Sequence, residues 1–158
     1  MVVHVGVVGS AVAAPELEAI AERVGRELAL AGAVVVSGGL GGVMAAASRG
    51  AVRAGGMTIG ILPGSARDQA NEWVRVAVPT GFGELRNGLV VRASHVVIAI
   101  GGEYGTLSEV ALALKTGVPV VGVGTWSLIR PDGGTDRGII PVEVDDAVPT
   151  ALALVASA

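Results

Sequence analysis

The stretch His95–Thr116, HVVIAIGGEYGTLSEVALALKT, contains the pattern that decides the fold. It begins with the aliphatic run His95–Ile100, which predicts a strand buried on both faces. A glycine-rich turn, Gly101–Thr106, follows, and the apolar spacing of Leu107–Thr116 predicts a helix that ends at Gly117. A strand, a glycine turn and a helix in this order are typical of a βαβ unit, whose strands lie parallel in one sheet.

The same alternation of short apolar runs and helical spacing extends in both directions from this stretch. Further strands are expected at Val2–Val8, Ala33–Ser37, Met57–Leu62, Trp73–Val78 and Pro119–Val123. Further helices are expected at Pro15–Ala31, Val43–Ala54, Phe82–Ala93 and Ala147–Ala156. Loops are expected at Pro63–Glu72 and Arg130–Arg137. The alternation predicts one Rossmann-like, doubly wound α/β domain over residues 1–158, with a mainly parallel sheet and helices on both faces.

The composition supports one domain with a large buried core. Hydrophobic residues make up 51% of the chain and charged residues 16%, which argues against disorder. Aromatic residues make up only 3% and the net charge is −3, so we expect no nucleic-acid partner. An acidic chain can still bind a phosphate, because backbone N–H groups can hold one.

The chain contains no cysteine, which excludes disulfides, zinc–thiolate sites and a thiol nucleophile. The opening residues, MVVHVGVVGS, lack the basic and extended apolar regions of a signal peptide. No apolar run reaches the roughly 18 uninterrupted residues of a membrane span. We therefore expect a cytoplasmic protein that has no membrane partner.

Glycine-rich turns between a strand and the following helix are the main functional signal. They are expected at Gly9-Ser10, at Gly38–Gly42 and at Gly101–Thr106, on one edge of the sheet. Glycine lets the backbone approach a ligand, and the following helix offers unpaired N–H groups and a positive dipole end. The turns therefore predict a phosphate site, although glycine at any single turn can simply close it tightly.

Other common sites do not match the sequence. No G-x-G-x-x-G follows the first strand, and there is no G-x-x-x-x-G-K-[ST] motif, so neither an ordinary NAD site nor a P-loop is expected. Lys115 lies near a helix end, where complementing the dipole is the simpler interpretation. His4 and His95 occupy strand positions that suit hydrogen-bonded structural histidines. No His, Asp and Glu residues are spaced like metal ligands, and we expect no metal site.

Glu109 and Arg86 are the candidate catalytic residues. Glu109 lies three residues beyond Thr106 and shares a helix face with it, so a phosphate on that turn would bring the attached sugar near the carboxylate. A carboxylate there could stabilise a cationic sugar or activate water, or it could only complement the helix terminus. Arg86 could bind a phosphate in bidentate fashion or lie solvated on the surface. Asn87 could hydrogen-bond a base or ribose, or act as a cap.

The segments Gly38–Met44, Arg86-Asn87 and Gly102–Glu109 together resemble the Lonely Guy (LOG) superfamily, whose members were often labelled "possible lysine decarboxylase". The superfamily is related to the nucleotide-binding fold of DprA. The resemblance covers nearly the whole chain. The stretch RNGLVVRASHVVIAIGG is especially similar to a short branch that includes the molybdenum cofactor carrier proteins.

The resemblance implies a role for each matching residue. Lonely Guy enzymes carry the motif P-G-G-x-G-T-x-x-E and hydrolyse nucleoside 5′-monophosphates to ribose 5-phosphate and a free base, without a required cofactor. Their catalytic arginine and glutamate match Arg86 and Glu109. The residues expected to bind the ligand are Gly9, Ser10, Gly38, Gly39, Gly41, Gly42, Met44, Asn87, Gly102, Gly105 and Thr106.

The sequence departs from the family motif at several positions. Gly101 replaces the motif proline, and Glu103 replaces its second glycine and adds negative charge beside the expected phosphate. Asn87 stands where cytokinin-activating members have lysine. The carrier branch binds its pterin cofactor without turning it over, so the same fold can serve without chemistry.

Two main functions follow from these observations, and a third is a regulatory nucleotide sensor that acts through oligomer contacts. The first is a nucleotide-binding LOG-like protein that cleaves the N-glycosidic bond of nucleoside 5′-monophosphates. The second is a non-catalytic carrier for molybdenum cofactor or a related ligand. The expected partners are a small nucleotide-like ligand, which can be a nucleotide, phosphate or molybdenum cofactor, and further copies of the chain. The resemblance implies a homodimer or a higher homo-oligomer.

Overall fold

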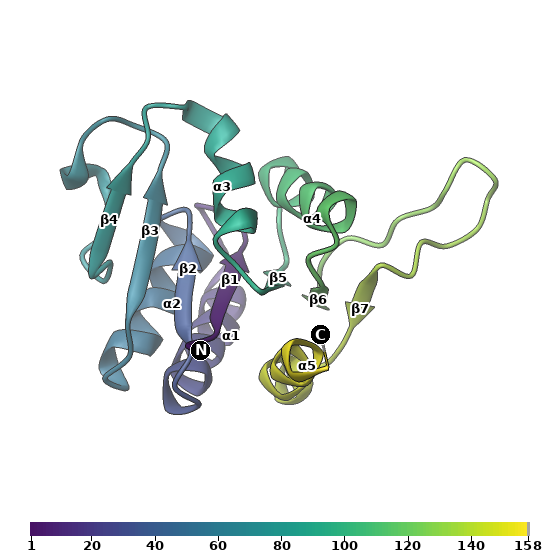
Figure 1. Cartoon of the computed structure of the whole chain (residues 1–158), viewed down its shortest axis with the longest axis horizontal. Coiled ribbons are helices and arrows are strands. Elements are labelled where there is room, and N and C mark those ends of the chain that lie inside the picture. The colour runs from purple at the N-terminus through teal and green to yellow at the C-terminus, as the bar shows by residue number, and fades with distance from the viewer. Residues whose placement is uncertain (158) are drawn as a thin grey trace.

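A computed structural model describes residues 1–157, which form a seven-stranded parallel sheet with helices on both faces (Figure 1). The strands are β1 (His4–Val8), β2 (Val34–Ser37), β3 (Thr58–Leu62), β4 (Val76–Pro79), β5 (Val96–Ile100), β6 (Val120–Val123) and β7 (Ile139–Pro141). Their order in the sheet is β4-β3-β2-β1-β5-β6-β7, and every neighbouring pair is parallel.

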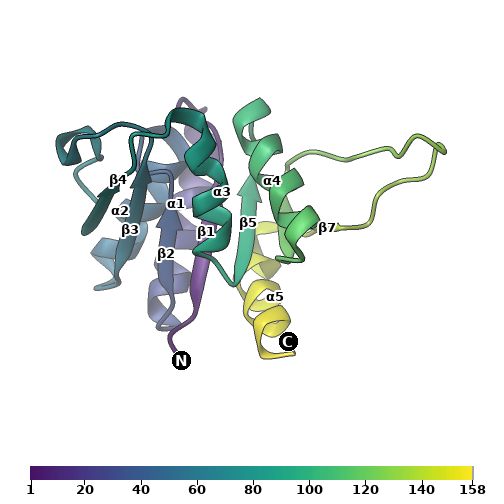
Figure 2. The ribbon, with the colours of Figure 1, turned by 45° about the horizontal axis from the view of Figure 1, so that its top comes forward.

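The helices divide between the two faces of this sheet. They are α1 (Pro15–Leu30), α2 (Gly42–Arg53), α3 (Asn87–Arg92), α4 (Tyr104–Thr116) and α5 (Val144–Ala156), with short 3₁₀ turns η1 (Arg67–Gln69) and η2 (Gly83–Arg86). In Figures 1 and 2, α3 and α4 cover one face, and α1, α2 and α5 cover the other. None of the helices in the described part of the chain is long and apolar enough to cross a membrane.

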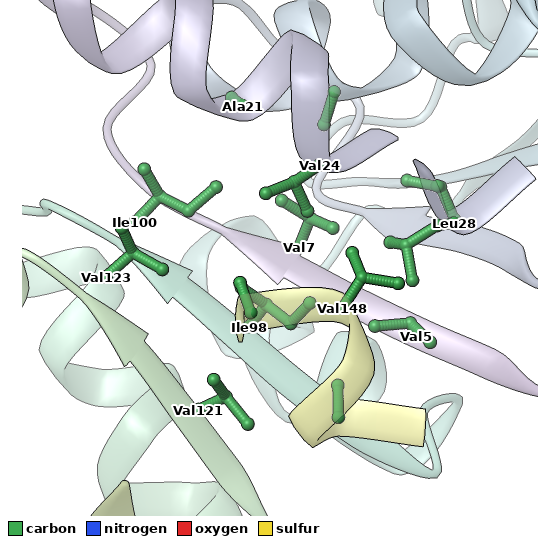
Figure 3. Close-up of a cluster of buried hydrophobic side chains, with 14 of the residues drawn as sticks. Val5, Val7, Ala21, Val24, Leu28, Ile98, Ile100, Val121, Val123 and Val148 are labelled. Atoms are coloured by element: carbon green, nitrogen blue, oxygen red, sulfur yellow. The ribbon is translucent and has the colours of Figure 1, made fainter. Parts of the chain in front are cut away.

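Aliphatic side chains fill both interfaces between the sheet and the helices. On the α1, α2 and α5 face, strand residues such as Val7 and Ile98 contact helix residues such as Val24 and Val148 (Figure 3). A second cluster lies under α3 and α4 and includes Val90. Because both faces are covered, the strands are nearly continuous Val and Ile runs, as expected of a parallel sheet.

Local sequence signals explain where several helices begin and end. Pro15 opens α1, where its fixed φ suits the first turn, and Glu16 and Glu18 lie near the positive end of the helix dipole. Gly117 ends α4 in the left-handed region with φ of 77°. These positions agree with the helix starts and stops that the sequence predicts.

The order in which strands are added to the sheet reverses between β1 and β5, although all strands stay parallel. From β1 the chain runs outward through β2, β3 and β4, and it then returns to place β5 on the other side of β1. In open α/β sheets, ligands bind beyond the carboxyl ends of the strands at this switch point. The turns after β1 and β5 begin at Gly9 and Gly101, so the topology places both at that position.

The predicted fold class is confirmed, and several predicted boundaries are corrected. Helix α4 begins at Tyr104 and not at Leu107, so part of the expected glycine turn is already helical. Helix α5 begins at Val144 and not at Ala147. The helix expected at 82–93 divides into η2 and α3, and the strand expected at 73–78 begins only at Val76.

The edge strand β7 was not predicted from the sequence. Strand β7 spans only Ile139–Pro141, which is too short for a clear apolar alternation. The segment 124–138 between β6 and β7 leaves the body of the sheet as a long extended loop (Figures 1 and 2). The expected loop at 130–137 lies within it, where Arg130 and Asp136 form an ion pair of 2.8 Å.

Candidate functional site

The glycines after β1 and β2 allow two turns to pack against each other. A Cβ added at Gly42, whose φ is 56°, would lie 2.2 Å from the Ser10 carbonyl oxygen, and one added at Gly9 would lie 2.5 Å from Val43. The Val43 amide donates to the Ser10 carbonyl at 3.0 Å. One amide at the start of α2 is therefore already used inside the protein, and close packing alone explains these glycines.

Gly38 and Gly39, which directly follow β2, are also positions where only glycine leaves room for neighbouring atoms. A Cβ at Gly38 would lie 2.4 Å from the Arg86 guanidinium and 2.8 Å from the Met44 sulfur, so glycine leaves room for both side chains. The Gly39 amide donates to Ser37 Oγ at 3.1 Å. The side-chain amide of Asn71 donates to the carbonyl of Gly39 at 3.2 Å. Asn71 lies in the segment expected only as a loop, so its role in holding this turn was not predicted.

The amino terminus of α4 is the open end at the switch point. The Leu107 amide donates to the Glu103 carbonyl at 3.0 Å, so the preceding amides of Tyr104, Gly105 and Thr106 have no acceptor within the helix. A Cβ added at Gly105 would have no heavy atom within 4 Å. The first turn of α4 therefore has N–H groups without a helical acceptor and open space beside Gly105, which suits an anion.

Arg86 and Glu109 meet beneath this helix end, as the sequence predicts for a shared site. Arg86 is 7% exposed and Glu109 is 6% exposed, and the guanidinium lies 3.9 Å from the carboxyl group. Burial raises the pKa of Glu109 to about 8, although the charge of Arg86 acts in the opposite direction. Burial also lowers the pKa of Arg86. Burial therefore favours the protonated form of Glu109, in which it does not cancel the charge of Arg86.

A short chain of hydrogen bonds fixes the Arg86 side chain. The guanidinium donates to the Asn87 side-chain oxygen, and Asn87 Nδ2 donates to Ser108 Oγ at 2.9 Å. The Ser108 hydroxyl donates in turn to the Gly105 carbonyl at 2.6 Å. Asn87 is thus engaged in positioning, and Ser108, which the sequence did not single out, connects Arg86 to the first turn of α4.

A small cavity borders the turn after β5. It measures about 270 Å³ and is lined by Gly101, Gly102, Gly124, Thr125 and Trp126. The Thr125 hydroxyl donates to the Gly101 carbonyl at 2.6 Å, which ties the turn after β6 to the turn after β5. Trp126 also lines a larger cleft of about 830 Å³ beside β7 and the start of α5. A tryptophan three residues after the end of a strand, in a chain so poor in aromatics, is the signal that could have identified this part of the site.

The remaining candidate groups lie away from this end of the sheet. The His4 amide donates to His95 Nδ1 at 3.0 Å at the amino ends of β1 and β5, which agrees with structural histidines. Lys115 lies exposed in the last turn of α4. Among residues 1–157, no three His, Cys, Asp or Glu side chains are grouped so that they could hold a metal ion.

Comparisons with known proteins agree with this fold. The model of the SLOG cluster4 family matches residues 2–150. An uncharacterized protein of Archaeoglobus fulgidus is 42% identical over 114 residues, which cover 72% of this chain and 75% of that protein.

Two solved structures are similar over almost the full length. The molybdenum cofactor binding protein of Rippkaea orientalis has 33% identity and a TM-score of 0.87, with 98% of each chain covered. The molybdenum cofactor carrier protein of Chlamydomonas reinhardtii has 33% identity and a TM-score of 0.83, with 99% of each chain covered.

Proposed function

This chain belongs to the SLOG cluster4 family, and from that premise we propose that it binds a phosphorylated, nucleotide-like small molecule. The phosphate binds to the free amides of Gly105 and Thr106, and molybdenum cofactor is the first candidate ligand. The observation that carries the proposal is the open amino terminus of α4, with the buried Arg86–Glu109 pair one turn inside it. Two similar structures are named as a binding and a carrier protein for that cofactor.

The charge of the site suits an anion at neutral pH. Glu109 is mostly protonated below pH 8 because its pKa is raised to about 8, so it does not cancel the charge of Arg86. The positive end of the α4 dipole adds to the attraction. Arg86 is held by Asn87 and Gly38, so its contribution is a fixed positive charge behind the amides.

Binding without turnover fits the state of the carboxyl group. A neutral Glu109 stabilises a cationic sugar far less than a carboxylate would. Among the described residues, Arg86 is the only ion-pair partner within 4 Å of the Glu109 carboxyl group. We therefore propose a carrier or binding protein as the main function.

Hydrolysis of a nucleoside 5′-monophosphate is the second candidate. A protonated Glu109 has the pKa of a general acid that works near neutral pH, and it lies one turn from the proposed phosphate position. In this reaction Glu109 gives its proton to the departing base. Water adds to the sugar carbon and returns a proton to the carboxylate, which yields ribose 5-phosphate and the free base.

One experiment separates the two functions. The purified protein is analysed by mass spectrometry for a bound pterin and is incubated with AMP while ribose 5-phosphate is assayed, with Glu109→Gln as control. A co-purified pterin with no release above the control supports the carrier. Release of ribose 5-phosphate that Glu109→Gln abolishes supports the hydrolase. If neither pterins nor nucleotides bind in a direct titration, both proposals fail.

A further inference from the structure

Two of the few aromatic residues in the chain meet beside the proposed phosphate position. The chain has two tryptophans, one tyrosine and one phenylalanine. The rings of Tyr104 and Trp126 lie with centroids 5.8 Å apart and planes inclined at 34°. Tyr104 opens α4, and Trp126 follows β6, so two separate elements bring these rings together.

Neither ring is fully buried, although Trp126 packs partly against the apolar cluster under α3 and α4. Tyr104 is 78% exposed, although its aromatic ring would gain from burial. Trp126 is half-buried and lines the 270 Å³ cavity. Its covered indole N–H has no acceptor among the residues that the structure describes, whereas a buried tryptophan usually donates a hydrogen bond.

Apart from Trp126 and Thr125, this cavity is lined by glycines, which have no side chains. Gly101 and Gly102 have φ of 55° and 118°, in the region that favours glycine. A Cβ added at Gly102 would lie 2.5 Å from Thr106, so a side chain cannot occupy this position. The hydrogen bond from Thr125 to Gly101 keeps the turn that carries Trp126 beside this glycine pair. The cavity is therefore bordered by glycine peptide groups, Thr125 and an aromatic ring.

We propose that Tyr104 and Trp126 form a stacking subsite for the planar, nitrogen-containing ring of the ligand. This inference rests on the proposed function, because it takes the phosphate to lie on the α4 amides next to Tyr104. A purine or a pterin has the flat π-face that stacking on these rings requires. Stacking tolerates either ring system, so the subsite selects for a fused heterocycle and against a phosphosugar alone.

The test uses the fluorescence of Trp126 in a Trp73→Phe background. Trp73 lies at the other edge of the sheet, near Arg53, and its removal leaves Trp126 as the only tryptophan. AMP, a phosphorylated pterin and ribose 5-phosphate are titrated in turn. We expect AMP or the pterin to quench Trp126 emission, and ribose 5-phosphate to bind without comparable quenching. The pterin and AMP arms show which ring system the subsite takes.

Affinities of variants complete the test, with binding measured by calorimetry. Trp126→Leu and Tyr104→Ala should each lower the affinity for the preferred ring-containing ligand about tenfold or more. The affinity for ribose 5-phosphate should stay unchanged. Trp126→Tyr should restore part of the loss, and Trp73→Leu should change neither affinity. Thermal unfolding verifies that each variant is folded.

The outcomes keep this inference distinct from the proposed function. Unchanged ring-ligand affinity in both variants, or an equal loss for ribose 5-phosphate, overturns the stacking subsite and leaves the phosphate site intact. If neither AMP, the pterin nor ribose 5-phosphate binds the parent protein, the proposed function fails and the subsite fails with it.

Discussion

Glu109 is a carboxyl group that folding places among apolar residues beside one cation. The sequence predicts that Arg86 and Glu109 belong to one site, because each matches a motif position and lies near a glycine turn. It does not predict the protonation state of Glu109, since this depends on burial created by residues distant in the chain. Asn71 and the role of Ser108 were missed for the same reason, because only the folded chain brings Asn71 to the turn after β2 and Asn87 to Ser108.

The raised pKa of Glu109 makes the stability of the protein depend on pH. The folded state keeps the proton up to about pH 8, whereas the unfolded chain releases it near the ordinary value of 4.5. The folded state therefore binds more protons between these values, and its free energy of unfolding falls as pH rises through them. A tenfold difference in proton affinity between the two states corresponds to roughly 1.4 kcal/mol of stability.

Glu109→Gln should remove this dependence. We expect the variant to gain stability relative to the parent as pH rises from 5 to 9, by about 1–4 kcal/mol at the upper end. Urea unfolding at several pH values measures the difference. Parallel pH profiles of the two proteins would show that Glu109 is not held protonated.

Glu103 is an exposed acidic residue at the N-cap of α4, where it opposes an approaching anion. Its side chain makes no capping hydrogen bond. Glu103→Gln should therefore tighten binding of ribose 5-phosphate about two- to fivefold at low salt, and the gain should shrink as salt is added. Calorimetric titration checks both effects, and an equal or weaker affinity in the variant would count against an anion at this helix end.

Helices α1 and α2 illustrate what sequence patterns reveal at the scale of elements. Their positions follow from apolar spacing and glycine stops, but their close crossing does not. A Cβ added at Gly25 would lie 1.9 Å from the Ala47 carbonyl oxygen, and one at Gly50 would lie 1.9 Å from that of Glu22. The early start of α4 and the short β7 were missed because glycine and proline weaken local helix and strand signals.

Gly25→Ala should destabilise the protein although alanine favours helices. The clash with a backbone carbonyl can be relieved only by moving the two helices apart, which we expect to cost about 1–3 kcal/mol. Gly88→Ala in α3 is the matched control, since its added Cβ would meet only Leu112 at 3.9 Å. Chemical denaturation compares them, and equal stabilities would contradict the tight crossing.

Across the whole molecule, the sequence predicts a sheet with helices on both faces. It does not predict the strand order or the protruding 124–138 loop.

The family resemblance of the sequence also predicts a homo-oligomer, for which one surface is suitable. A common groove is lined by four exposed, large apolar residues, Phe82 just before η2, Leu85 on η2, Leu89 on α3 and Leu112 on α4. Arg86 and Asn87 lie on the same short segment, so a second copy of the chain on this surface would lie near the site.

Leu85→Asp should therefore lower the oligomeric state. Leu85 is 84% exposed in the described chain, so the change should leave the fold intact. Leu30→Asp places the same charge on an exposed leucine of α1 and should have no effect on assembly. Light scattering coupled to gel filtration measures the mass, and an identical assembly in both variants would reject this surface as the interface.

The central claim is that an anion binds to the backbone amides that open α4, above the Arg86–Glu109 pair. A crystal structure of the protein with ribose 5-phosphate tests it most directly. We predict that the phosphate accepts hydrogen bonds from the Gly105 and Thr106 amides, with the sugar directed toward Glu109. A phosphate bound elsewhere, for example in the cleft beside β7, with no ligand at the start of α4, would contradict the claim.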